Sequence, residues 1–207
     1  MPLSVFGTGL VTGLACYHLR SVDYLPQSFL TYVLRLMVSQ PQTALPCPFC
    51  VRIADTNREP PGELVWSFPN SLAFLGRWQH WQGYVVLVSR THCREPIHLP
   101  TDELAAYTGE MHLLAKAVEK AFAPHKLNYE LLGNQVEHPH WHIFPRSATE
   151  EERLQPVWVV IANAEKSSNS QEEVARLEAG ELQRPAICHK LKTALRELNA
   201  PRYQEPA

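Results

Sequence analysis

Three histidines stand at alternate positions in residues 138–146, which read HPHWHIFPR. In an extended chain successive side chains point to opposite faces, so His138, His140 and His142 would share one face of a strand. Imidazole is a nucleophile and an acid-base group near neutral pH, and it is also a common metal ligand. Arg146 ends the stretch and brings a cation nearby. The residues leave three interpretations open: phosphate chemistry, a catalytic metal site, or a polar strand face without chemistry.

A second set of potential metal ligands precedes this motif. Cys47 and Cys50 have the spacing with which a tight turn presents two thiolates to one ion. His92 follows a strongly apolar stretch at 83–89, and His138 is the other distant histidine that could complete a tetrahedral set. The pattern predicts a structural zinc site, with two free thiols or a redox pair as the alternatives.

Length and composition limit the class of protein. The chain has 207 residues, 45% hydrophobic and 19% charged, which is enough for one principal hydrophobic core. A formal charge of −2 gives no electrostatic argument for a nucleic-acid or membrane partner. Five cysteines, an odd number, and the absence of a basic segment before the apolar run at 10–16 predict a reducing, cytoplasmic location.

Short strands and one long helix are expected around these motifs. Besides the histidine segment, strands are expected at 63–68, 71–75, 83–89, 127–132 and 157–162, most of them in an antiparallel meander. A long helix is expected at 101–123, with Thr101 as its cap, and shorter helices at 29–38, 171–180 and 186–198. The expected organisation is an N-terminal extension at 1–45, a principal domain at 46–165 and a C-terminal helical extension at 166–207.

The histidine segment resembles the His-x-His-x-His signature of the histidine triad superfamily. The resemblance extends to CPFC at 47–50, LVWSFPNSLAFLG at 64–76, GYVVLVSRTH at 83–92 and the helix at 101–123. It implies an α+β fold, with a long helix packed on an antiparallel β-sheet, and a homodimer. It also implies a nucleotide or nucleotide-conjugate substrate that is split or transferred through a phosphohistidine. Zinc-bearing relatives hold their metal at the positions of Cys47, Cys50, His92 and His138.

The resemblance also assigns roles within the triad. His140 is expected to attack the α-phosphorus, and His142 to contact the phosphate and the leaving group. His142 favours hydrolysis, because the galactose-1-phosphate uridylyltransferase branch has Gln there and an amide cannot protonate a leaving group. Asn134 and Gln135 stand where relatives have Gln-Ser or Gln-Thr, and they are expected to contact the substrate through an amide N–H.

Two other positions depart from the family pattern. Relatives have Asp or Asn after Ala-Phe-Leu to hold the ribose hydroxyls, whereas this chain has Gly76, and their Gly-His opening of the long strand is Gly83-Tyr84 here. The expected function is that of a nucleotide hydrolase or nucleotidyltransferase acting on nucleoside phosphoramidates, dinucleoside polyphosphates or related conjugates. A non-catalytic nucleotide-binding module and a zinc-dependent hydrolase, with the histidine cluster as metal ligands, remain the alternatives.

Overall fold

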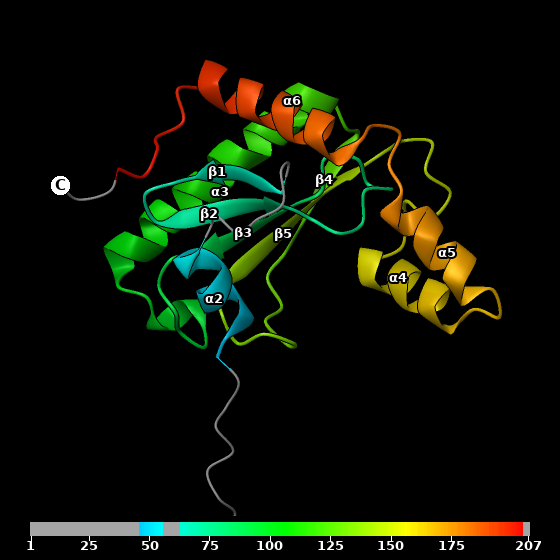
Figure 1. Cartoon of the computed structure of the whole chain (residues 1–207), viewed down its shortest axis with the longest axis horizontal. Coiled ribbons are helices and arrows are strands. Elements are labelled where there is room, and N and C mark those ends of the chain that lie inside the picture. Colours follow the sequence, from blue (N-terminus) through cyan, green and yellow to red (C-terminus); the bar gives the residue numbers. More distant parts are fainter. Residues whose placement is uncertain (1–45, 56–62, 205–207) are drawn as a thin grey trace, which may run out of the picture. The chain divides into compact units, whose positions relative to one another are not determined.

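The computed structural model describes residues 46–55 and 63–204, and in them five strands form one antiparallel sheet in the order β1-β2-β3-β5-β4 (Figure 1). The strands are β1 (Leu64–Ser67), β2 (Ser71–Leu75), β3 (Val85–Ser89), β4 (Lys126–Glu130) and β5 (His140–Arg146). The helices are α2 (Pro48–Ala54), α3 (Thr101–Phe122), α4 (Val157–Lys166), α5 (Ser170–Glu178) and α6 (Arg184–Glu197), with a 3-10 turn, η2, at Pro96–His98. The α+β prediction, an antiparallel sheet with a long helix packed on it, is confirmed.

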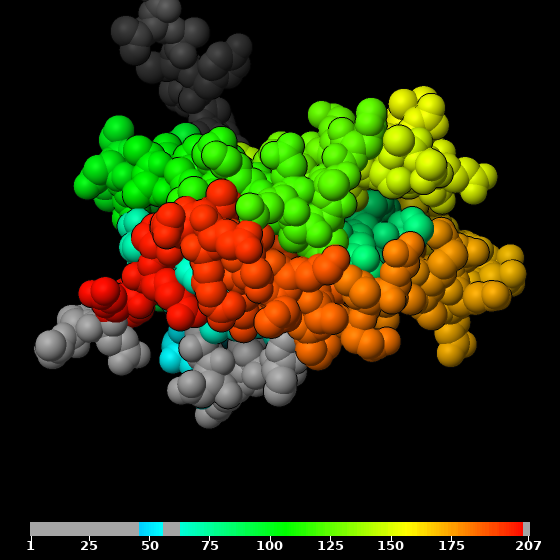
Figure 2. Space-filling model, turned by 90° about the horizontal axis from the view of Figure 1, so that it is seen from above, coloured from blue at the N-terminus to red at the C-terminus, as the bar shows by residue number. Residues whose placement is uncertain are grey.

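Both faces of the sheet are covered, which accounts for the continuous apolar character of the central strands. Leu87 of β3 faces a core shared with α3 and α6, which includes Leu114 and Leu191. Figure 2 shows α6 running alongside α3 over this side of the molecule. On the opposite face, Val88 of β3 belongs to a smaller cluster against which Phe49 of α2 packs. The sheet thus separates the main core under α3 and α6 from the side that carries the triad.

The predicted strand at 157–162 is wrong, because these residues form the first turns of helix α4. Pro156 is the N-cap, and a proline beside a helix start supplies a φ angle suited to it. The buried residues recur at the three- and four-residue spacing of a helix face: Val157, Val160, Ile161 and Ala164. An unbroken apolar run carries no period of its own, so packing decided between strand and helix.

Three local predictions are also corrected. Thr101 does not cap α3, because Pro100 is the N-cap and no side-chain cap bond is formed there. The tight turn expected at CPFC is instead the first turn of a helix, since α2 begins at Pro48 and contains Cys50. The histidine strand begins at His140, so His138 lies just before β5 and its side chain is placed by a loop.

Residues 46–207 form one compact unit. Helix α4 crosses the predicted boundary at residue 165, and α6 contributes Ile187, Leu191 and Leu195 to the same core as the sheet. The expected extension at 1–45, with its helix at 29–38, lies outside the described residues. Within the described ranges, no helix is both long and apolar enough to cross a membrane.

Candidate metal centre and active site

Four potential metal ligands converge from three separate segments. Cys47 and Cys50 come from the start of α2, His92 follows β3, and His138 precedes β5; their ligand atoms all lie within 4.8 Å of one another. His138 Nδ1 lies 3.5 Å from Cys47 Sγ, 3.7 Å from Cys50 Sγ and 3.1 Å from His92 Nδ1. Cys50 Sγ lies 3.4 Å from His92 Nδ1. The structure therefore brings together all four residues that the sequence predicts as metal ligands.

The spacing of these atoms fits a tetrahedral zinc ion. Zinc bond lengths place two ligand nitrogens about 3.3 Å apart, and a sulfur and a nitrogen about 3.6 Å apart. The ring of His138 is oriented for this purpose, because its Nε2 donates a hydrogen bond to the carbonyl oxygen of Ser89 at 2.8 Å. The Nδ1 lone pair of His138 is then turned toward the cysteines. Histidine ligands of metals typically make such a hydrogen bond with their second ring nitrogen. Burial, together with the neighbouring Cys47, raises the pKa of the Cys50 thiol, so metal binding would release its proton.

His140 is the first residue of β5, and its ring is held by a short hydrogen bond. Its Nδ1 lies 2.6 Å from the carbonyl oxygen of His138, which can only accept, so Nδ1 carries the proton and the Nε2 lone pair is free. Phe49 packs against the imidazole at 4.8 Å between ring centroids. Burial lowers the pKa of His140, and the hydrogen bond to His138 only partly opposes this effect. The lowered pKa favours the neutral imidazole, which is the form that a nucleophile requires.

His142 lies one strand period further and is surrounded by aromatic rings. Its ring centroid is 4.8 Å from that of His140, and Trp158 of α4 meets it edge-on at 5.1 Å. Its Nδ1 lies 2.7 Å from the hydroxyl of Tyr84. Burial, with a smaller effect from the charge of His140, lowers the pKa of His142 to about 3. His142 is therefore uncharged at neutral pH.

Strand register explains why these two rings are neighbours. His140 and His142 of β5 pair with Val88 and Val86 of β3, so both side chains stand on the face that α2 and α4 cover. Trp141, between them, packs against the core on the opposite face. The alternation expected from the sequence thus holds for His140 and His142, while the loop before β5 turns His138 toward the cysteines.

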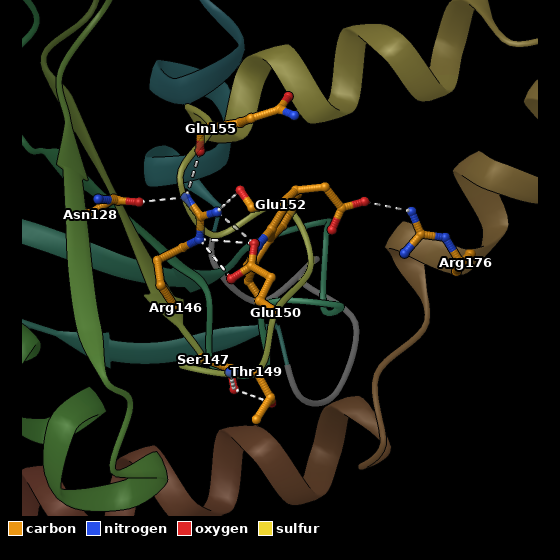
Figure 3. Close-up of polar contacts among 9 residues, drawn as sticks. Asn128, Arg146, Ser147, Thr149, Glu150, Glu152, Gln155 and Arg176 are labelled. Carbon is orange, nitrogen blue, oxygen red and sulfur yellow. Dashed lines mark hydrogen bonds and ion pairs between the residues drawn. The ribbon is translucent and has the colours of Figure 1, made fainter.

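Arg146, at the end of β5, does not offer a free cation. Its guanidinium donates to both carboxylate oxygens of Glu150, to the amide oxygen of Asn128 and to the backbone carbonyl oxygens of Glu152 and Gln155 (Figure 3). The side chains of Arg146 and Glu150 are only 3% and 5% exposed. This ion pair secures the loop that leads into α4, the helix that places Trp158 on His142.

A cavity of about 760 Å³ lies beside this network, and no triad histidine lines it. Figure 2 shows the recess between α5 and the segment that follows α3. His80, His125 and Arg176 are among its lining residues. This cavity is thus distinct from the triad, whose own surroundings are packed with rings.

Asn134 and Gln135 are exposed in the loop between β4 and β5. The structure shows no hydrogen bond from either residue to the triad within the part of the chain that it describes. Tyr84 and Trp158, by contrast, contact His142, and the sequence reasoning gave neither of them a role in the site. For Tyr84 the sequence offers a signal, because the resemblance implies histidine at this position; for Trp158 it offers none, because the apolar run at 157–162 predicts a strand.

Comparisons with known proteins agree with this geometry. Residues 57–149 match the HIT domain family, whereas no curated protein matches the chain. A zinc-bound histidine triad family protein from Mycobacterium smegmatis superposes with a TM-score of 0.52 at 17% identity, covering 74% of this chain and 96% of that one. A hypothetical histidine triad nucleotide-binding protein from Sulfolobus tokodaii strain7 gives a TM-score of 0.52 at 18% identity, covering 72% and 94%. Residues 57–149 are thus similar to the HIT domain, and the chain shares its fold with histidine triad proteins.

Proposed function

We propose that this protein is a nucleotide hydrolase or nucleotidyltransferase that acts on nucleoside phosphoramidates, dinucleoside polyphosphates or related nucleoside monophosphate conjugates. The match of residues 57–149 to the HIT domain supports a nucleotide-binding or hydrolase-type function. The observation that carries the proposal is the 2.6 Å hydrogen bond from His140 Nδ1 to the carbonyl oxygen of His138. It leaves Nε2 of a neutral imidazole as the only nitrogen of His140 that can attack phosphorus.

The proposed reaction has two displacements at the α-phosphorus. First, Nε2 of His140 forms a bond to phosphorus while the bond from phosphorus to the leaving group breaks, and the leaving group takes up a proton from solvent, which the attacking water of the second step gives back. Water then attacks the same phosphorus and the phosphorus–nitrogen bond breaks. This step releases the nucleoside monophosphate and returns His140 to its neutral form. A second nucleophile in place of water would give transfer instead of hydrolysis.

In this proposal His142 acts as a hydrogen-bond donor and not as a strong general acid. Because burial and the neighbouring His140 keep its pKa at about 3, it meets the substrate as a neutral ring. A neutral imidazole can donate its one N–H to a phosphate oxygen and stabilise the charge that develops there. The incoming negative charge would also raise its affinity for a proton.

The zinc proposed at Cys47, Cys50, His92 and His138 is structural. Bound there, the ion would join the start of α2 to the segments flanking β3 and β5, and so fix the backbone that carries His140. The alternative of a zinc-dependent hydrolase finds less support. Nδ1 of His140 is committed to a backbone carbonyl and Nδ1 of His142 to Tyr84, and the ligand group that the described residues form contains His138 but neither of these two histidines.

The purified protein should be screened against nucleoside phosphoramidates, dinucleoside polyphosphates and nucleotide sugars, with trapping of an acid-labile phosphohistidine. His140→Ala should abolish turnover and labelling while circular dichroism stays unchanged. The matched control is His98→Ala, since His98 is exposed on η2. Retained turnover in His140→Ala would overturn the proposal. Binding of AMP without turnover of any substrate would instead identify a non-catalytic nucleotide-binding module. The homodimer implied by the resemblance stays a prediction.

A further inference from the structure

The ring of Tyr84 occupies a buried slot between two strands. It stacks on Phe144 with centroids 3.8 Å apart and planes 13° apart, and only 3% of its surface is exposed. On its other side lies the backbone of Gly76, whose N–H donates to the carbonyl oxygen of Tyr84 at 2.9 Å. The hydroxyl group reaches Nδ1 of His142 at 2.7 Å. Tyr84 thus links β2 to the triad by packing at one end and by a hydrogen bond at the other.

Gly76 leaves the space that this ring fills. A Cβ atom built on Gly76 would lie 2.2 Å from two ring atoms of Tyr84, far inside van der Waals contact. The backbone of Gly76 cannot easily move away, since its carbonyl accepts hydrogen bonds from Gln79 at 2.8 Å and from Arg184 at 3.0 Å. Its φ angle is not in the left-handed region, so the glycine is required by the neighbouring ring and not by the backbone.

The hydrogen bond to His142 has a preferred direction. Among the described residues, Nδ1 of His142 is the one partner of the Tyr84 hydroxyl, and burial raises the pKa of this phenol, so it keeps its proton. A buried hydroxyl without an acceptor is costly, so the favourable arrangement has O–H donating to Nδ1. The proton of the neutral His142 ring is then on Nε2, the nitrogen not used by Tyr84.

We propose that Tyr84 is the positioning residue of His142, holding its neutral ring in the Nε2–H tautomer, and that Gly76 is present because Tyr84 fills the place of a side chain there. The catalytic consequence rests on the proposed function: His142 presents a single fixed donor to a substrate oxygen. The two departures from the family pattern then depend on each other, because the tyrosine at 84 fits only beside the glycine at 76. No side chain at position 76 takes part in substrate recognition.

The tautomer is measured directly by nitrogen-15 NMR of the ligand-free protein, with the His142 signals assigned by their loss in His142→Gln. The wild type should show one protonated and one unprotonated ring nitrogen, with the proton on Nε2. Tyr84→Phe should shift the two nitrogens toward averaged values and lower kcat by roughly three- to tenfold, with little change in KM. An unchanged Nε2–H tautomer in Tyr84→Phe would overturn the proposal. Because this readout needs no turnover, it stays valid even if the proposed function fails.

The claim about Gly76 is tested by a double-mutant cycle on stability. Gly76→Ala should lower the urea midpoint in the wild-type background and have little effect in Tyr84→Ala, where the ring is gone. Gly109→Ala is the matched control, since a Cβ at Gly109 meets nothing within 4 Å, and its midpoint should not fall. An equal loss from Gly76→Ala in both backgrounds would refute the assignment of that space to Tyr84.

Discussion

Removal of the Glu150 carboxylate should destabilise the folded protein more than the loss of a loop carboxylate usually does, because this side chain is only 5% exposed. Glu150→Ala leaves the Arg146 guanidinium buried without its counter-charge, and it also removes the acceptor of the Trp81 indole N–H, which lies 2.8 Å from Glu150 Oε1. Breaking a buried ion pair from one side costs about 3–5 kcal/mol of unfolding free energy. We expect a loss in that range, because both side chains are almost fully buried.

The control is Glu178→Ala, which breaks the pair between Arg77 and Glu178. Those side chains are 62% and 41% exposed, so the expected loss is about 0–1 kcal/mol. Urea denaturation at neutral pH, followed by circular dichroism, compares the two variants. The double variant with Arg146→Met and Glu150→Leu should recover part of the loss, since it leaves no buried charge, while the Trp81 N–H still lacks its acceptor. Equal, small losses for Glu150→Ala and Glu178→Ala would refute the reasoning.

The same ion pair predicts a pH dependence. Burial raises the pKa of Glu150, but its hydrogen bonds with Arg146 and Trp81, together with the charges of Arg146 and His80, outweigh burial, so the net pKa lies below the ordinary value. A lowered pKa in the folded state means that the carboxylate contributes its full stabilisation above about pH 4.3 and loses it as the pH falls through the lowered value. Glu150→Gln should flatten this part of the stability profile. An equally steep acid limb in Glu150→Gln would assign the loss to other carboxylates.

Two further predictions concern metal and core. Metal analysis should find one zinc per chain; Cys50→Ser should lose it, while Cys93→Ser should keep it. Chelation should lower the thermal midpoint by roughly 8–16 °C if free zinc had been 1,000-fold above its Kd, and an unchanged midpoint would contradict a structural ion. Glu110, 4% exposed, accepts hydrogen bonds from the backbone and side-chain N–H groups of Asn70 and from the hydroxyl of Ser71. Glu110→Ala should therefore cost about 2–3 kcal/mol in urea denaturation, and a loss below about 1 kcal/mol would show that water satisfies these donors.

Sequence reasoning located most elements because their local signals are strong. The strand expected at 71–75 is β2 without change, and the helix expected at 101–123 differs from α3 by one residue. The strand predicted at 157–162 is wrong because the local signal there is ambiguous. Six apolar or small residues in succession fit a buried strand and a helix equally well, and packing against the cluster that contains Phe144, Trp81 and Leu177 selected the helix.

The sequence by itself determined which residues could carry chemistry: CxxC, a histidine after an apolar strand, and three histidines at alternate positions. These are local facts of residue type and spacing. Only the tertiary structure decided how the histidines divide, with His138 turned to the cysteines by the carbonyl of Ser89 and His142 bound to Tyr84. The physical reason is that such contacts join strands far apart in the chain, where register and side-chain packing set which atoms meet, and no local pattern records them.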